Sequence, residues 1–189
     1  MKKKLIFTKF ALFAVLLFGM FSCTRDDSAP TDNPSAASGP FVAKVDGTQF
    51  ATDNSKASSK FVASTKMLQI MGQTSDQKET IIFQLMPFGN TVSAAVDWKP
   101  GTYYFDPIHI TELKYSASAL YTKYVGSEYT NWSTSWEYVK NGKIIIESNT
   151  GTHIKGTFFF DTVKQNSNGT FDSSNIKKIT EGSFDLDIK

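Results

Sequence analysis

Residues 183–189 read Ser-Phe-Asp-Leu-Asp-Ile-Lys, and this alternation is the clearest structural signal in the chain. Phe184, Leu186 and Ile188 occupy every second position, with polar side chains between them. Successive side chains of a β-strand point to opposite faces, so such a strand has one apolar and one polar face. The pattern therefore predicts a strand that covers a core on one side and meets water on the other.

Similar alternation recurs upstream, between clusters of turn residues. Asp46-Gly47 and Asn141-Gly142 are typical of tight turns between strands, and residues 101–105 are aromatic and strand-prone. The other alternating runs are 41–45, 67–70, 81–85, 144–146 and 154–160. Short strands separated by turn residues predict an all-β domain, as an antiparallel β-sandwich or, alternatively, a lipocalin-like β-barrel.

Residues 112–124 fit two structures, because their apolar side chains match one face of a helix as well as one face of a strand. No clear helix N-cap precedes the segment. All neighbouring segments predict strands, so we expect a strand here, with a helix as the alternative.

The first 22 residues have the features of a lipoprotein signal peptide. Four lysines precede an apolar run from Phe10 to Phe18. That run has 9 residues, whereas a membrane-spanning helix needs about 20, so an uncleaved transmembrane anchor is the weaker alternative. Residues 20–23 read Met-Phe-Ser-Cys and resemble a bacterial lipobox, and Cys23 is the only cysteine in the chain. We expect cleavage before Cys23 and lipidation of its sulfur, which anchors the protein to a membrane.

Residues 23–40 are expected to form a flexible tether that leads to a β-domain at 41–189. The tether contains three prolines among small and polar residues, and it has no aromatic side chain. Removing the leader removes four of the 20 lysine and arginine residues and none of the 18 acidic residues, which leaves a net charge of −2. We therefore expect no nucleic acid among the partners.

Four segments resemble a Bacteroidota-type family of lipoproteins of unknown function. They are 41–50, which reads Phe-Val-Ala-Lys-Val-Asp-Gly-Thr-Gln-Phe, and 142–146, 154–160 and 179–184. The resemblance implies an all-β fold and a lipoprotein of the outer membrane, facing the periplasm or the cell surface. Its motifs are structural and imply no catalytic residue.

Residues suited to catalysis or metal binding are few and scattered. His109 and His153 are the two histidines, and each alternates with isoleucine in a strand-like run. Neither lies near a Gly-x-Ser-x-Gly turn, and two histidines alone do not make a zinc site. Asp185 and Asp187 share one face of a strand, where a calcium site is the alternative to a solvated face. We predict no catalytic residue, no metal and no cofactor, with an unrecognised hydrolase as the alternative to a protein that is not an enzyme.

Residues 115–138 combine aromatic side chains with serine, threonine and asparagine. Aromatic rings beside hydroxyls and amides bind sugar rings or apolar patches of partner proteins, and they also fill the open end of a β core. The candidate binding residues are Tyr121, Tyr129, Trp132 and Trp136. We expect a binding or interaction module for a glycan or a surface protein, with a lipocalin-like carrier of a small apolar ligand as the alternative.

Two short motifs resemble the O-glycosylation acceptors of Bacteroidota-type exported proteins. Asp27-Ser28-Ala29 lies in the tether, where it is accessible. Asp161-Thr162-Val163 lies at the end of a predicted strand, where it can be hidden. Ser28 and Thr162 are therefore candidate modification sites, and Ser28 is the better of the two.

Overall fold

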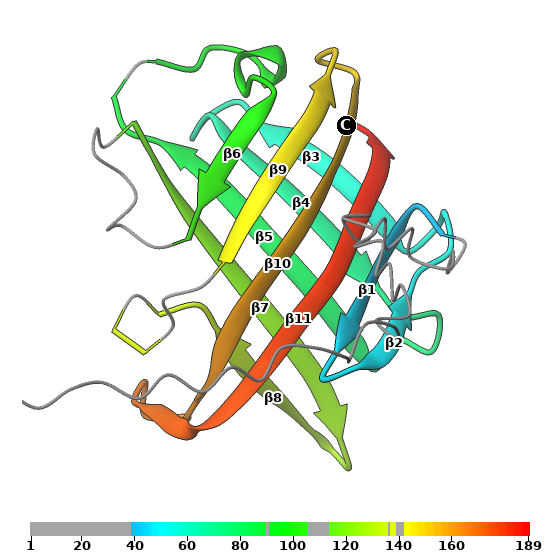
Figure 1. Cartoon of the computed structure of the whole chain (residues 1–189), viewed down its shortest axis with the longest axis vertical. Helices are drawn as coiled ribbons and strands as arrows, with labels where there is room; N and C mark the ends of the chain where they lie inside the picture. Colours follow the sequence, from blue (N-terminus) through cyan, green and yellow to red (C-terminus); the bar gives the residue numbers. More distant parts are fainter. Residues whose placement is uncertain (1–38, 90, 106–113, 136, 139–141) are drawn as a thin grey trace, which may run out of the picture. The chain divides into compact units, whose positions relative to one another are not determined.

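The computed structural model describes residues 39–189 except 90, 106–113, 136 and 139–141 (Figure 1). This part of the chain contains eleven strands and one 3-10 helix, η1, at Ala95–Asp97. The strands are β1 (Phe41–Val45), β2 (Thr48–Ala51), β3 (Ala57–Val62), β4 (Met67–Gln73), β5 (Glu79–Pro87), β6 (Gly101–Tyr104), β7 (Tyr115–Val125), β8 (Glu128–Ser133), β9 (Gly142–Asn149), β10 (His153–Gln165) and β11 (Phe171–Asp187). Within the described residues, no helix combines the length and the apolar character needed to cross a membrane.

The eleven strands belong to one antiparallel sheet that is not closed into a barrel. Its order is β2-β1-β11-β10-β8-β7-β5-β4-β3, and β6 joins through β9, which pairs with β10. In Figure 1, β6, β9, β10 and β11 lie in front of β3, β4, β5 and β7, so the sheet folds over into two layers. The predicted all-β class is confirmed, and the arrangement is consistent with a β-sandwich.

Phenylalanine rings from both layers fill the space between them. The ring centroid of Phe83, on β5, lies 5.0 Å from that of Phe158, 5.7 Å from that of Phe184 and 6.1 Å from that of Phe41. None of these four side chains is more than 3% exposed. Aromatic pairs at such separations stabilise a core beyond the area that they bury, so this cluster is the centre of the fold.

Two glycines make room for rings of this cluster. Gly156 of β10 is the cross-strand partner of Phe184, and Gly182 of β11 is the partner of Phe158. A Cβ atom on Gly182 would lie 2.5 Å from the Phe158 ring, and one on Gly156 would overlap the carbonyl oxygen of Ile145 and the Phe184 ring. Each ring thus lies over a position where a side chain cannot fit.

The end of β11 joins one corner of the two layers. Ser59 of β3 and Ile188 form an isolated parallel bridge. The amide of Phe61 donates to the carbonyl of Lys189 at 3.2 Å, and the amide of Lys189 donates to the carbonyl of Ser59 at 3.0 Å. These bonds give the edge strand β3 partners on its otherwise open side.

Most of the predicted strands are confirmed. The alternating run at 183–189 forms the end of β11 as far as Asp187, and the strand already begins at Phe171. The ambiguous segment forms the strand β7 where it is described. The sequence does not predict β3, because its buried positions are the small Ala57 and the polar Ser59 rather than large apolar residues.

Candidate functional site

The structure divides the candidate aromatic residues between the core and the surface. Tyr121 is 1% exposed and Trp132 is 6% exposed, whereas Tyr129 is 65% exposed. Trp136 lies outside the described residues. The binding surface expected from the sequence therefore needs correction at Tyr121 and Trp132, whose rings face the core.

Polar partners at one end of the core allow Tyr121 and Trp132 to be buried. The Tyr121 hydroxyl donates to Glu79 at 2.8 Å, and Trp132 Nε1 donates to Asn175 Oδ1 at 3.0 Å. The ammonium of Lys177 lies 5.7 Å from the centroid of the Trp132 ring. Burial, followed by the hydrogen bond to Glu79, raises the pKa of Tyr121 well above its ordinary value. The two rings are thus core residues with satisfied polar atoms.

Tyr129 instead forms an exposed pair with Tyr124 on the outer face of the β7–β8 hairpin. The two residues are direct cross-strand partners, and their ring centroids lie 4.9 Å apart at an interplanar angle of 54°. Both rings present apolar faces and hydroxyl groups at the surface. We call them the tyrosine pair.

Amide and hydroxyl side chains continue this outer face across neighbouring strands. Gln73, Thr80, Thr122 and Asn131 are successive cross-strand partners on β4, β5, β7 and β8, and Gln165 of β10 is the next partner of Asn131. Directly opposed residues of antiparallel strands share a face, so these five uncharged side chains form one row, the polar row. All five are partly or fully exposed.

Hydrogen bonds and a further aromatic contact order parts of this surface. Gln73 donates to the Thr80 hydroxyl at 3.4 Å, and the Thr122 hydroxyl donates to Asn131 Oδ1 at 2.9 Å. On β11, Phe171 follows the polar row as the cross-strand partner of Gln165, and its ring centroid lies 5.7 Å from that of Tyr138. The polar row therefore has aromatic rings beside it on the β7–β8 hairpin and beyond it on β11.

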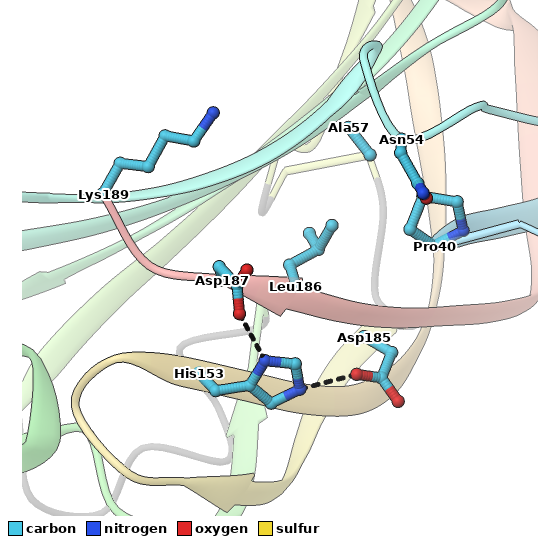
Figure 2. Close-up of a pocket in the computed structure, with 8 residues that line it drawn as sticks. All are labelled: Pro40, Asn54, Ala57, His153, Asp185, Leu186, Asp187 and Lys189. Atoms are coloured by element: carbon cyan, nitrogen blue, oxygen red, sulfur yellow. Dashed lines mark hydrogen bonds and ion pairs between the residues drawn. The ribbon is translucent and has the colours of Figure 1, made fainter.

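A second polar group surrounds His153, where β10 begins (Figure 2). Nδ1 of His153 lies 2.8 Å from Asp187 Oδ1, and Nε2 lies 2.6 Å from Asp185 Oδ1. An imidazole donates from both nitrogens only when it is protonated. The hydrogen bond to Asp187, followed by that to Asp185, therefore raises the pKa of His153 above its usual range.

The His153 group forms part of an open pocket of about 290 Å³. Figure 2 shows the imidazole between the two carboxylates, with the other pocket residues around Leu186. Those residues are Pro40, Asn54, Ala57 and Lys189. Among the described side chains, no set of three or more His, Cys, Asp and Glu residues is arranged to hold a metal ion. The group is thus a solvent-facing set of ion pairs beside a mixed polar and apolar pocket.

The remaining positions singled out from the sequence fall into two classes. Cys23, Ser28 and His109 lie outside the described residues. Thr162 is described and is 0% exposed, and its hydroxyl donates to the carbonyl of Lys177 at 3.3 Å. The folded domain therefore hides Thr162 from a glycosylating enzyme.

We expect His153 to titrate above about 6.5, the usual value for histidine, and Asp187→Asn to lower its pKa more than Asp185→Asn does. The raised pKa means that the ion pairs stabilise the fold fully below the unfolded-state pKa. This stabilisation is lost as the pH rises through the folded-state pKa. Because the side chains are exposed, the effect on stability is small, and imidazole NMR signals are the better measurement.

Asp172→Asn is the control for this titration, since Asp172 is a partly exposed aspartate that accepts hydrogen bonds from Ser174 instead. It should leave the midpoint of His153 unchanged. A His153 midpoint at or below the ordinary value in the unaltered protein would contradict the ion-pair geometry.

Comparison with known proteins gives one match. A family model described as a domain of unknown function, DUF6252, matches residues 37–185. No curated protein and no solved structure matches the chain. The matched range contains the tyrosine pair and every residue of the polar row.

Proposed function

The chain belongs to the DUF6252 family of domains of unknown function, and from the chemistry of its surface we propose that it is a lipid-anchored binding module for glycans at the outer membrane. The tyrosine pair beside the polar row is the observation that carries this proposal. Sugar rings stack their C–H faces on aromatic rings, and their hydroxyls bond to amides and hydroxyls. Both kinds of group lie together on this outer face.

The core packing favours a surface module over a carrier of a small apolar ligand. A carrier needs an apolar space between its layers. In this domain, that space holds the rings of Phe41, Phe83, Phe158 and Phe184, which are at most 3% exposed. The outer face is the better place to look for a ligand.

Lipid anchoring is supported by the position of Cys23 directly after the leader. We expect the mature protein to begin at Cys23 and to carry lipid on its sulfur and an acyl group on its amino terminus. Mass spectrometry of the amino-terminal peptide measures both features. An unmodified Cys23, or cleavage at another position, would rule out the anchor.

Glycan binding is tested with the full chain in detergent on a glycan array, followed by calorimetry with the glycans that it retains. Tyr124→Ala and Tyr129→Ala should each weaken binding by about tenfold, because each removes one stacking ring. The far-UV circular dichroism should stay unchanged, since both residues lie on the surface.

Phe159→Ala is the matched control, because Phe159 is an aromatic residue of β10 that is 41% exposed and is not part of the tyrosine pair. It should bind as the unaltered protein does. The proposal is wrong if no glycan is retained, or if both tyrosine variants bind with unchanged affinity.

A further inference from the structure

The polar row has a regular spacing that follows from the sheet itself. Neighbouring strands lie about 4.8 Å apart, and each of the five strands contributes one side chain to the row. From Gln73 on β4 to Gln165 on β10 there are four such steps, so the row spans roughly 19 Å. Each step is close to the length of one sugar ring in a linear chain.

The polar row contains no ionised side chain. The charged residues next to it in sequence are Glu79, Lys123 and Lys164, which precede Thr80, follow Thr122 and precede Gln165. By strand alternation all three lie on the other face of the sheet, where Glu79 and Lys123 form an ion pair at 2.7 Å and Lys164 is the cross-strand partner of Trp132. A ligand on the row therefore meets hydrogen-bonding groups without having to desolvate an unpaired charge.

The tyrosine pair lies beside the middle of the row. Tyr124 follows Thr122 by two residues on β7, and Tyr129 precedes Asn131 by two residues on β8. Residues two apart on a strand share a face and lie about 6.6 Å from one another. A sugar that stacks on the pair is thus within reach of the amide and hydroxyl groups of both neighbouring strands.

We propose that the polar row is the binding track of an uncharged, linear oligosaccharide, which lies across the strands with one unit stacked on the tyrosine pair. This inference rests on the proposed function and adds the class and length of the glycan. The units on either side of the stacked unit bond to Gln73 and Thr80 in one direction and to Gln165 in the other. Affinity then grows with chain length until the row is filled.

Calorimetry with the full chain tests this inference. The probes are cello- and malto-oligosaccharides from disaccharide to hexasaccharide, with an oligogalacturonate hexasaccharide as the charged comparison. We expect a neutral hexasaccharide to bind at least about tenfold more tightly than its disaccharide, because it makes hydrogen bonds on additional strands. The oligogalacturonate should bind more weakly than the neutral hexasaccharide.

A variant at the end of the polar row distinguishes binding along the whole row from binding at the tyrosine pair alone. Gln73→Ala should weaken hexasaccharide binding by about fivefold, through loss of one set of hydrogen bonds, and should leave disaccharide binding unchanged. Gln69→Ala is the control, because Gln69 lies on β4 four residues away, outside the row. It should change neither affinity.

Three results overturn the inference in distinguishable ways. Equal affinity for disaccharide and hexasaccharide would contradict binding along the polar row, but it would leave the tyrosine pair as a glycan site. Tighter binding of the oligogalacturonate than of every neutral probe removes the uncharged class. Failure to bind any glycan removes the proposed function as well.

Discussion

Replacing Phe83 with alanine is expected to lower the free energy of unfolding by about 3–5 kcal/mol. Phe83 is 1% exposed, and its ring contacts those of Phe41, Phe158 and Phe184 across the two layers. Alanine would leave a cavity that three strands of the facing layer border at once, so the surroundings cannot collapse by moving one strand alone. Domains of this size are stable by only about 5–15 kcal/mol in total.

Urea unfolding followed by tryptophan fluorescence measures this loss as a shift of the midpoint. Phe159→Ala is again the matched control, because this substitution also removes a phenyl ring, but from a partly exposed position on β10. Phe159→Ala should lower the free energy of unfolding far less than Phe83→Ala does. Equal losses at the two positions would show that the ring cluster is not the centre of stability.

Gly156→Ala is expected to destabilise the domain by about 1–3 kcal/mol, as overpacking of a filled core does. The sign of this change in stability is informative, because alanine in the middle of a strand otherwise makes a protein more stable than glycine does, by about 0.5–1 kcal/mol. At this position the added methyl group would overlap the carbonyl oxygen of Ile145 and the ring of Phe184. The carbonyl belongs to the β9 backbone, which is paired with β10 and cannot rotate away as a side chain can.

Thr157→Ala is the control for this change. Thr157 is the next residue of β10, and its half-buried side chain lies on the opposite face of the strand. The urea midpoint of Thr157→Ala should fall much less than that of Gly156→Ala. A Gly156→Ala variant as stable as the unaltered protein would show that the Phe184 ring does not require this glycine.

Strand periodicity explains why the fold could be predicted from the sequence. In β1 and at the end of β11, apolar residues occupy alternate positions, and the same positions are buried in the structure. The periodicity fails for β8, where Trp132 is buried but the other inward positions are polar. Pairing with β7 and β10, rather than its own composition, makes this segment a strand.

The sequence could not identify the site fully, because it does not show on which face of the sheet each aromatic ring lies. Tyr129 and Trp132 are three residues apart on β8, so they must point to opposite faces. The sequence does not say which face is covered, because both carry aromatic and polar residues. The pairing of Tyr121 with Ile81, which is itself buried, places Tyr121 inside and Tyr124 outside.

Long-range register explains what else the sequence could not reveal. The polar row exists because four separate strand pairings align its members. His153 meets Asp187 across a hairpin whose register shifts twice. Residue spacing in the sequence predicts neither alignment. It does predict that Asp185 and Asp187 share one face of the strand.

The parallel bridge at Ser59 and Ile188 has a consequence for the order in which the domain can fold. The hydroxyl of Ser59 bonds to the carbonyl of Asp187, which is 128 residues further along the chain. Contacts between such distant residues form slowly, because the intervening chain must first be confined. Until they form, β3 presents unpaired backbone groups to any neighbouring molecule. The time needed to form the contacts between β3 and the end of the chain therefore sets how long a newly made chain is exposed to edge-to-edge aggregation.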